Sequence, residues 1–214
     1  VNMSTDVLVL GDSYACLDDT HSHWATMWAQ SQDLTVEHQG YPGASHVHII
    51  NSFLSAGLPI AKHIIYHVTD FLRADITTQS DNTDNILEFY NKSEHISMEK
   101  LYLEAENRHT ASTNRQNSDT DQFYNSIYIP WLARANMFAC DTLINRCKQS
   151  DTQLTLVLWP GIVVCADNFP DSDIFEIQHD ISTSPNRAPK NDSINHLTKS
   201  EHRQICTQFH RRSQ

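Results

Sequence analysis

The sequence predicts a single α/β/α domain, in which helices cover both faces of a mostly parallel sheet. Short apolar, β-branched runs alternate along the chain with segments whose apolar residues recur at helical spacing. Such alternation is typical of parallel strands joined by crossover helices. The length of 214 residues suits one domain of this kind and is short for two.

Four runs of β-type residues predict the strands of this sheet. The first is apolar and stops at Gly11, and the second alternates as LTVEHQG. The third and fourth are again rich in β-branched residues. The runs lie at 5–10, 34–40, 62–70 and 153–160.

Four helices are expected between and after these strands. Gly57 is expected to end the second, and Pro130 lies in the first turn of the third. Thr198 and Glu201 form a capping-box pattern at the start of the last. The expected ranges are 20–30, 44–57, 127–148 and 197–212.

Two segments interrupt the alternation. Residues 76–121 are polar, with one helix expected around 93–108, and residues 167–192 are expected to form a long loop containing Pro and Asp. Such insertions usually run over one face of a domain. Two alternatives are open for each: a lid over a site, or a solvated excursion without a role.

Composition excludes several classes of partner. The formal net charge is -11, and the longest basic run is Arg211-Arg212. We therefore expect neither nucleic acid nor an anionic membrane surface as a partner.

No apolar stretch of about 18 residues predicts a membrane span. The N-terminus lacks the pattern of a signal peptide. The five scattered cysteines favour reduced thiols in the cytoplasm or another reducing compartment. The oligomeric state is left open.

Two His-x-His pairs invite a metal interpretation. They are His21/His23 and His46/His48. Each pair supplies only two ligands, and neither has a Cys or a further His at a motif-like spacing. We therefore expect no metal site.

Polar and small residues gather where the predicted strands end. Gly11-Asp12-Ser13 follows the first strand, residues 40–45 (GYPGAS) follow the second, and Thr69-Asp70 follows the third. A further polar cluster precedes the last helix. Ligands of open parallel sheets bind at the carboxyl ends of the strands, so these clusters are expected to face one crevice.

Acyl transfer is the chemistry that unites these residues. Ser13 is the candidate nucleophile, and a serine hydroxyl needs a base, for which His196 is the candidate. Asp192 is the candidate partner of that base, and the N–H groups of Ser13 and Gly43 are suitable oxyanion donors. Plainer alternatives exist: Ser13 as a cap, Gly43 as a turn glycine, and His196 as part of a helix cap.

The chain resembles the SGNH, or GDSL, family of serine esterases and lipases. VLGDSYA is similar to the first block of that family, HQGYPGAS to the second and NHLTKSEHRQI to the last. The resemblance implies a flavodoxin-like three-layer fold, Ser13 as nucleophile, Gly43 as oxyanion donor and His196 as base. It implies no metal and no cofactor.

Two positions depart from the pattern of that family. Its third block has Gly-x-Asn-Asp, whereas this chain has His67-Val68-Thr69-Asp70. Thr69 therefore stands where the family has an Asn that donates to the oxyanion. Either Thr69 or another group supplies that hydrogen bond here, or the enzyme is slow.

The family places Asp three residues before the His, whereas Asp192 lies four before His196. Either a one-residue bulge brings Asp192 to His196, or the site is a Ser–His dyad. His202, inside a predicted helix, is a weaker base candidate.

The expected function is hydrolysis of a small ester or an acylated carbohydrate through an acyl-enzyme. The polar loops favour a small acyl group such as acetyl. Two alternatives remain: a catalytically degenerate module that binds an acylated glycan or a protein surface, and an acyltransferase that uses the same residues. The sequence does not indicate which ester is cleaved.

Overall fold

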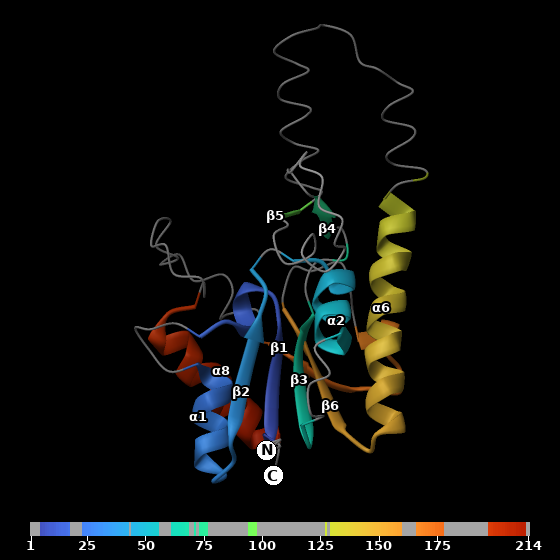
Figure 1. Ribbon diagram of the computed structural model, residues 1–214. Helices are drawn as coiled ribbons and strands as arrows, with labels where there is room; N and C mark the ends of the chain where they lie inside the picture. Colours follow the sequence, from blue (N-terminus) through green and yellow to red (C-terminus); the bar gives the residue numbers. More distant parts are fainter. Residues whose placement is uncertain are drawn as a thin grey trace, which may run out of the picture.

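The protein is a three-layer α/β/α domain built on a parallel sheet (Figure 1). Five strands form that sheet in the order β2-β1-β3-β6-β7. The computed structural model describes residues 5–17, 23–42, 44–55, 61–68, 71, 73–76, 94–97, 127, 129–159, 166–177 and 197–212. The strands are β1 (Val7–Gly11), β2 (Val36–Gly40), β3 (His63–Val68), β6 (Gln153–Leu158) and β7 (Asp173–Glu176).

Among the described elements, two helices cover each face of the sheet. The pair α1 (Trp24–Ser31) and α8 (Lys199–Arg212) packs on one face, and the pair α2 (His46–Ser55) and α6 (Ile129–Gln149) packs on the other. Two short 3-10 helices are also described. The first, η1 (Ser13–Ala15), follows β1, and the other, η3 (Ala166–Asn168), precedes β7. Among the described helices, none has the length and apolar character that crossing a bilayer requires.

The alternation of side chains along the strands divides the core into two layers. Leu8 and Leu10 of β1 pack toward α2 and α6, whereas Val7 and Val9 pack toward α1 and α8. All four are at most 2% exposed. Successive strand residues point to opposite faces, so a strand covered on both sides must be apolar throughout. This requirement explains the uninterrupted run VLVL.

The four helices expected between and after the strands are present, as are the central strands, with small shifts at their ends. The N-cap of the first helix is a histidine: Nδ1 of His23 accepts the N–H of Ala25 at 3.1 Å. The capping box of α8 forms as predicted, with Thr198 Oγ1 accepting the N–H of Glu201 and Glu201 Oε2 accepting that of Thr198. Pro130 lies in the first turn of α6, also as predicted.

The structure differs from expectation in two segments. Residues 173–176, expected within a long loop, form the edge strand β7, of which Phe175 alone is buried. So short an edge strand has little apolar signal. Residues 94–97, expected to start a helix, form β5 (Glu94–Ser97), which pairs antiparallel with β4 (Arg73–Ile76). That pairing joins segments far apart in the sequence and leaves no local pattern. The remainder of the polar segment 76–121 lies outside the described residues.

Candidate functional site

Ser13 lies at the carboxyl edge of the sheet, at the point where the strand order reverses. β1 has β2 on one side and β3 on the other, and η1 begins two residues after β1 ends. Crevices outside such switch points are where open α/β sheets bind their ligands. The strand order therefore places Ser13 where a binding site is expected.

The turn that carries Ser13 is fixed by its own backbone and by Asp12. Asp12 is 2% exposed, and its Oδ1 accepts the N–H of Tyr14 at 3.1 Å. The carbonyls of Asp12 and Ser13 accept the N–H groups of Ala15 and Cys16 at 3.0 and 3.2 Å. Ser13 is 6% exposed, and its side chain has no hydrogen-bond partner among the described residues. Asp12 is therefore a structural cap, which holds the serine in a single turn.

Two glycines allow this turn to pack closely on its neighbours. A Cβ at Gly40 would lie 2.6 Å from the backbone nitrogen of Cys16 and 2.8 Å from its Cα. A Cβ at Gly11 would lie 2.7 Å from the Cβ of His67. Real Cβ atoms do not approach this closely, so both positions require glycine for space. Cys16 packs here as expected, and burial raises the pKa of its thiol to about 11.

Aromatic rings support the Ser13 turn from the neighbouring strands. Tyr14 stacks on Trp159, which follows β6, with ring centroids 4.1 Å apart. The Trp159 indole in turn donates from Nε1 to Nδ1 of His67 at 3.2 Å. His67 is fully buried near the end of β3. The residue after the candidate nucleophile is thus linked to two strands beyond its own.

Histidines fill the space beneath this turn, and their contacts make them neutral structural groups. His23 donates from Nε2 to the carbonyl of Tyr14 at 2.8 Å and caps α1 with Nδ1. His38 contacts the Ala15 carbonyl through Nδ1 at 3.0 Å and the Thr26 hydroxyl through Nε2 at 2.8 Å. Burial lowers the pKa of His23 and of His38, and it lowers the pKa of His67 to about 3.

His202 belongs to the same group and joins two helices. It is fully buried in α8, and its Nδ1 accepts the backbone N–H of Trp24 at 3.1 Å. Its ring centroid lies 5.1 Å from that of His23. Nδ1 of His202 is thus already used as the acceptor for the first N–H of α1. This contact fits the prediction that His202 is a weaker candidate base than His196.

Asn136 of α6 fastens two of the segments that follow strand ends. It is fully buried, its Nδ2 donates to the carbonyl of Phe71 at 2.8 Å, and its Oδ1 accepts the N–H of Val47 at 3.3 Å. Ser45 caps α2, because its Oγ accepts the N–H of His48 at 3.2 Å. These contacts fix the first turn of α2 and one residue of the segment after β3.

Among the predicted site residues, the structure describes Ser13 and the weaker base candidate His202. Gly43, Thr69, Asp192 and His196 lie outside the described residues. Residues next to them are placed: Tyr41 and Ala44, joined by a 3.1 Å backbone hydrogen bond; Val68, which ends β3; and Leu197, which is 4% exposed. The predicted arrangement of these residues around Ser13 therefore stays a prediction.

The described histidines and cysteines do not gather as metal ligands. Among the residues with described placement, no three His, Cys, Asp or Glu side chains form a group able to hold an ion. His46 contacts the hydroxyl of Tyr66 and lies 3.3 Å from the sulfur of Cys140. Burial raises the pKa of the Cys140 thiol well above its usual range, so this buried thiol is unreactive.

Sequence reasoning missed the residues that support the turn. Trp159 directly follows β6, so its place at the carboxyl edge of a predicted strand was a usable signal. Asn136 gave no signal, because a single polar residue on a long helix is ordinary. The importance of His67 was visible only as a departure from the glycine of the third block.

Comparison with known proteins gives a likeness in fold. No protein-family model matches the chain, and no curated protein sequence matches it. Among solved structures, one from Desulfitobacterium hafniense DCB-2, described as a "putative lipolytic protein of G-D-S-L family", matches with a TM-score of 0.50. The match covers 97% of this chain and 99% of the other, at 9% sequence identity. The protein thus has the fold of that structure, a three-layer α/β/α domain with a parallel central sheet.

Proposed function

We propose that the protein is a serine hydrolase that cleaves a small ester through an acyl-enzyme intermediate. The observation that carries the proposal is the position of Ser13: a capped turn at the carboxyl end of β1, beside the switch point of the sheet. The order of the sequence blocks that resemble the SGNH family supports it, as does the fold shared with a protein described as lipolytic.

The proposed reaction has two steps. The Ser13 oxygen attacks the ester carbonyl while a ring nitrogen of His196 takes the serine proton. The tetrahedral intermediate collapses, His196 gives the proton to the departing alcohol, and the acyl group stays on Ser13. Water then attacks the acyl-enzyme by the same route, which releases the acid and restores the serine.

The remaining roles follow from the sequence and from the position of Ser13 in η1. The first N–H groups of a helix have no partner within it, so the Ser13 N–H is a suitable oxyanion donor. The Gly43 N–H and the Thr69 hydroxyl are the other proposed donors. Asp192 is proposed to orient His196. A small acyl group such as acetyl is the proposed acyl part of the substrate, which is a simple ester or an acylated carbohydrate.

Two departures in the sequence favour a second candidate function. Thr69 replaces an amide donor, and Asp192 lies one residue out of step with the family pattern. A chain with these changes also suits a module that binds an acylated glycan or a protein surface without cleaving it. Transfer of the acyl group to an alcohol other than water is a variant of the first proposal and uses the same residues.

One labelling experiment separates a hydrolase from a binding module. A fluorophosphonate probe is expected to label the wild-type chain and not Ser13→Ala, whereas Ser31→Ala, an exposed serine at the end of α1, is labelled normally. Ser13→Ala is also expected to lose at least about 1000-fold in turnover of p-nitrophenyl acetate. A wild-type chain that resists the probe favours the binding module, and equal turnover by Ser13→Ala rejects the hydrolase.

A further inference from the structure

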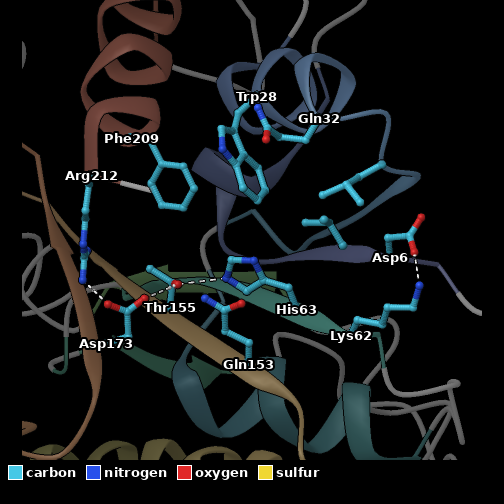
Figure 2. A pocket seen from close by; sticks show the side chains of 12 residues that line it. Asp6, Trp28, Gln32, Lys62, His63, Gln153, Thr155, Asp173, Phe209 and Arg212 are labelled. Atoms are coloured by element: carbon cyan, nitrogen blue, oxygen red, sulfur yellow. Dashed lines mark hydrogen bonds and ion pairs between the residues drawn. The ribbon is translucent and has the colours of Figure 1, made fainter. Parts of the chain in front are cut away.

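A cavity lies at the edge of the sheet opposite to Ser13 (Figure 2). Its volume is about 630 Å³, which falls within the range of small-molecule pockets. It is lined by residues from the starts of β1, β3, β6 and β7 and from the ends of α1 and α8. Because Ser13 follows the other end of β1, the cavity is separate from the proposed active site.

A chain of hydrogen bonds fixes the orientation of His63 in this cavity. The Thr155 hydroxyl donates to Oδ2 of Asp173 at 2.6 Å, and Asp173 is paired through its other oxygen with Arg212. The single proton of Thr155 is then used, so the contact of 2.9 Å between Thr155 Oγ1 and His63 Nε2 is a donation from the imidazole. His63 therefore carries its proton on Nε2, and its Nδ1 has a free lone pair.

That lone pair opens on the cavity. His63 is 8% exposed and lines the cavity, with its ring below Trp28 in Figure 2. Among the described residues Nδ1 has no hydrogen-bond partner, yet it is not one of the fully buried unpaired atoms. Burial lowers the pKa of His63 to about 4, so the ring is neutral near pH 7. The cavity thus presents one acceptor that no described group of the protein satisfies.

At its rim, where Lys62 and Arg212 lie, the cavity offers hydrogen-bond donors instead of an acceptor. Lys62 Nζ contacts Oδ1 of Asp6 at 2.7 Å, and the Lys62 side chain is 76% exposed. Thr35 occupies the other Asp6 oxygen through its N–H and its hydroxyl. The carboxylates of Asp6 and Asp173 at the rim are therefore both engaged. The ammonium of Lys62 and the guanidinium of Arg212 each have N–H groups beyond their one ion pair. Such groups bind carboxylates well.

The third feature is an aromatic wall. Trp28 and Phe209 meet edge to face with ring centroids 4.9 Å apart, and Trp28 also stands edge to face against His63 at 5.7 Å. Both side chains line the cavity between the rim and the helices above it (Figure 2). Aromatic walls favour a flat ring as ligand.

We propose that this cavity binds a small aromatic carboxylic acid that carries a hydroxyl or N–H donor on its ring. The donor satisfies Nδ1 of His63, the ring lies against Trp28 and Phe209, and the carboxylate reaches Lys62. The site requires nothing of the reaction at Ser13 and stands whether or not the chain is a hydrolase.

The first test varies the ligand and uses the full wild-type chain near pH 7.5, at about one unit above the ordinary pKa of histidine. The probes are 4-hydroxybenzoate, benzoate, which lacks the donor, and 4-hydroxybenzyl alcohol, which lacks the charge. Binding is followed through the indole N–H resonances, with that of Trp28 assigned from Trp28→Phe. We expect 4-hydroxybenzoate to bind at least about 5-fold more tightly than either relative and to shift the Trp28 resonance. Equal binding of the three probes, or no shift at Trp28, overturns the proposal.

The second test varies the protein. In His63→Phe, 4-hydroxybenzoate and benzoate are expected to bind equally. Lys62→Gln, at an exposed side chain that tolerates change, is expected to weaken both carboxylates and to leave the alcohol unaffected. Lys148→Gln, an exposed lysine on α6, is the matched control and binds all three as the wild type does. If both Lys62→Gln and His63→Phe retain the wild-type affinities, the site is not the one proposed. If His63→Phe does not fold, Lys62→Gln and the wild-type ligand series decide whether the proposal stands.

Discussion

The indole nitrogen of Trp159 donates to Nδ1 of His67 across 3.2 Å, and this bond ties the carboxyl ends of β6 and β3 together. On its other side Trp159 stacks on Tyr14, the residue after the candidate nucleophile. The bulk of His67 is accommodated because its neighbour on β1 is Gly11. A large histidine at this position of β3 is therefore part of the support for the Ser13 turn.

Trp159→Phe tests this support. Phenylalanine keeps a ring against Tyr14 but removes the donor to His67, which leaves a buried nitrogen without its partner. We expect a loss of about 1–2 kcal/mol in the free energy of unfolding. Urea denaturation measures it, with Trp131→Phe as control, because Trp131 is 60% exposed on α6. The same loss in both variants would mean that the bond to His67 contributes nothing.

Gly40→Ala tests the close approach of β2 to the Ser13 turn. The new Cβ would lie 2.6 Å and 2.8 Å from backbone atoms of Cys16, so the backbone itself must move. We expect a cost of about 1–3 kcal/mol in stability, together with slower labelling of Ser13 by a fluorophosphonate.

The double variant Gly40→Ala/Cys16→Ala distinguishes a backbone clash from a side-chain clash. Removing the sulfur leaves the nitrogen and Cα of residue 16 in place, so no recovery of the melting temperature is expected. Cys16→Ala alone gives the reference. A double variant as stable as Cys16→Ala would show that only the thiol obstructs the alanine.

The buried histidines make stability depend on pH. Burial holds the pKa of His67 at about 3 and that of His63 at about 4, whereas unfolded histidine titrates near 6.5. The unfolded chain therefore takes up protons first as the pH falls below about 6.5, and each such histidine is expected to cost on the order of 1–3 kcal/mol by pH 4.5.

Urea midpoints measured between about pH 7.5 and 4.5 test this expectation, and they should fall once the pH drops below about 6.5. His67→Asn keeps an acceptor for Trp159 and removes one titrating ring, so its midpoint is expected to fall less steeply. A midpoint that is flat down to about pH 5 would contradict the neutral buried state of these rings.

The sequence predicted the fold well where burial is two-sided and failed where the signal is short or nonlocal. VLVL at 7–10 is apolar throughout, and HIIYHV at 63–68 is buried throughout, because both faces of these strands are covered. By contrast, β7 buries only Phe175, and β5 is specified by pairing with β4. No local periodicity marks either of them, which explains why both were expected to be something else.

For the candidate site, the sequence located Ser13 but not its supports. A glycine, an acid and a serine after a buried strand are a local signal, and Asp12 does cap the turn. The contacts of Trp159 with Tyr14 and His67, and of Asn136 with Val47 and Phe71, cross between elements. Such contacts depend on the three-dimensional arrangement, which residue spacing does not encode.

Thr198→Ala tests whether the first turn of α8 matters to the reaction as well as to the fold. Thr198 and Glu201 exchange hydrogen bonds of 3.3 and 2.6 Å, and Thr198 lies two residues after His196, the proposed base. Alanine removes the cap and is expected to cost about 1 kcal/mol in stability, whereas Thr198→Ser keeps the hydroxyl and nearly the whole of that energy. Because a loosened first turn displaces the proposed base, kcat for p-nitrophenyl acetate should fall in Thr198→Ala and recover in Thr198→Ser, with KM little changed. If Thr198→Ala loses stability but keeps its kcat, the capping box serves the helix alone, and the position of His196 is set by other contacts.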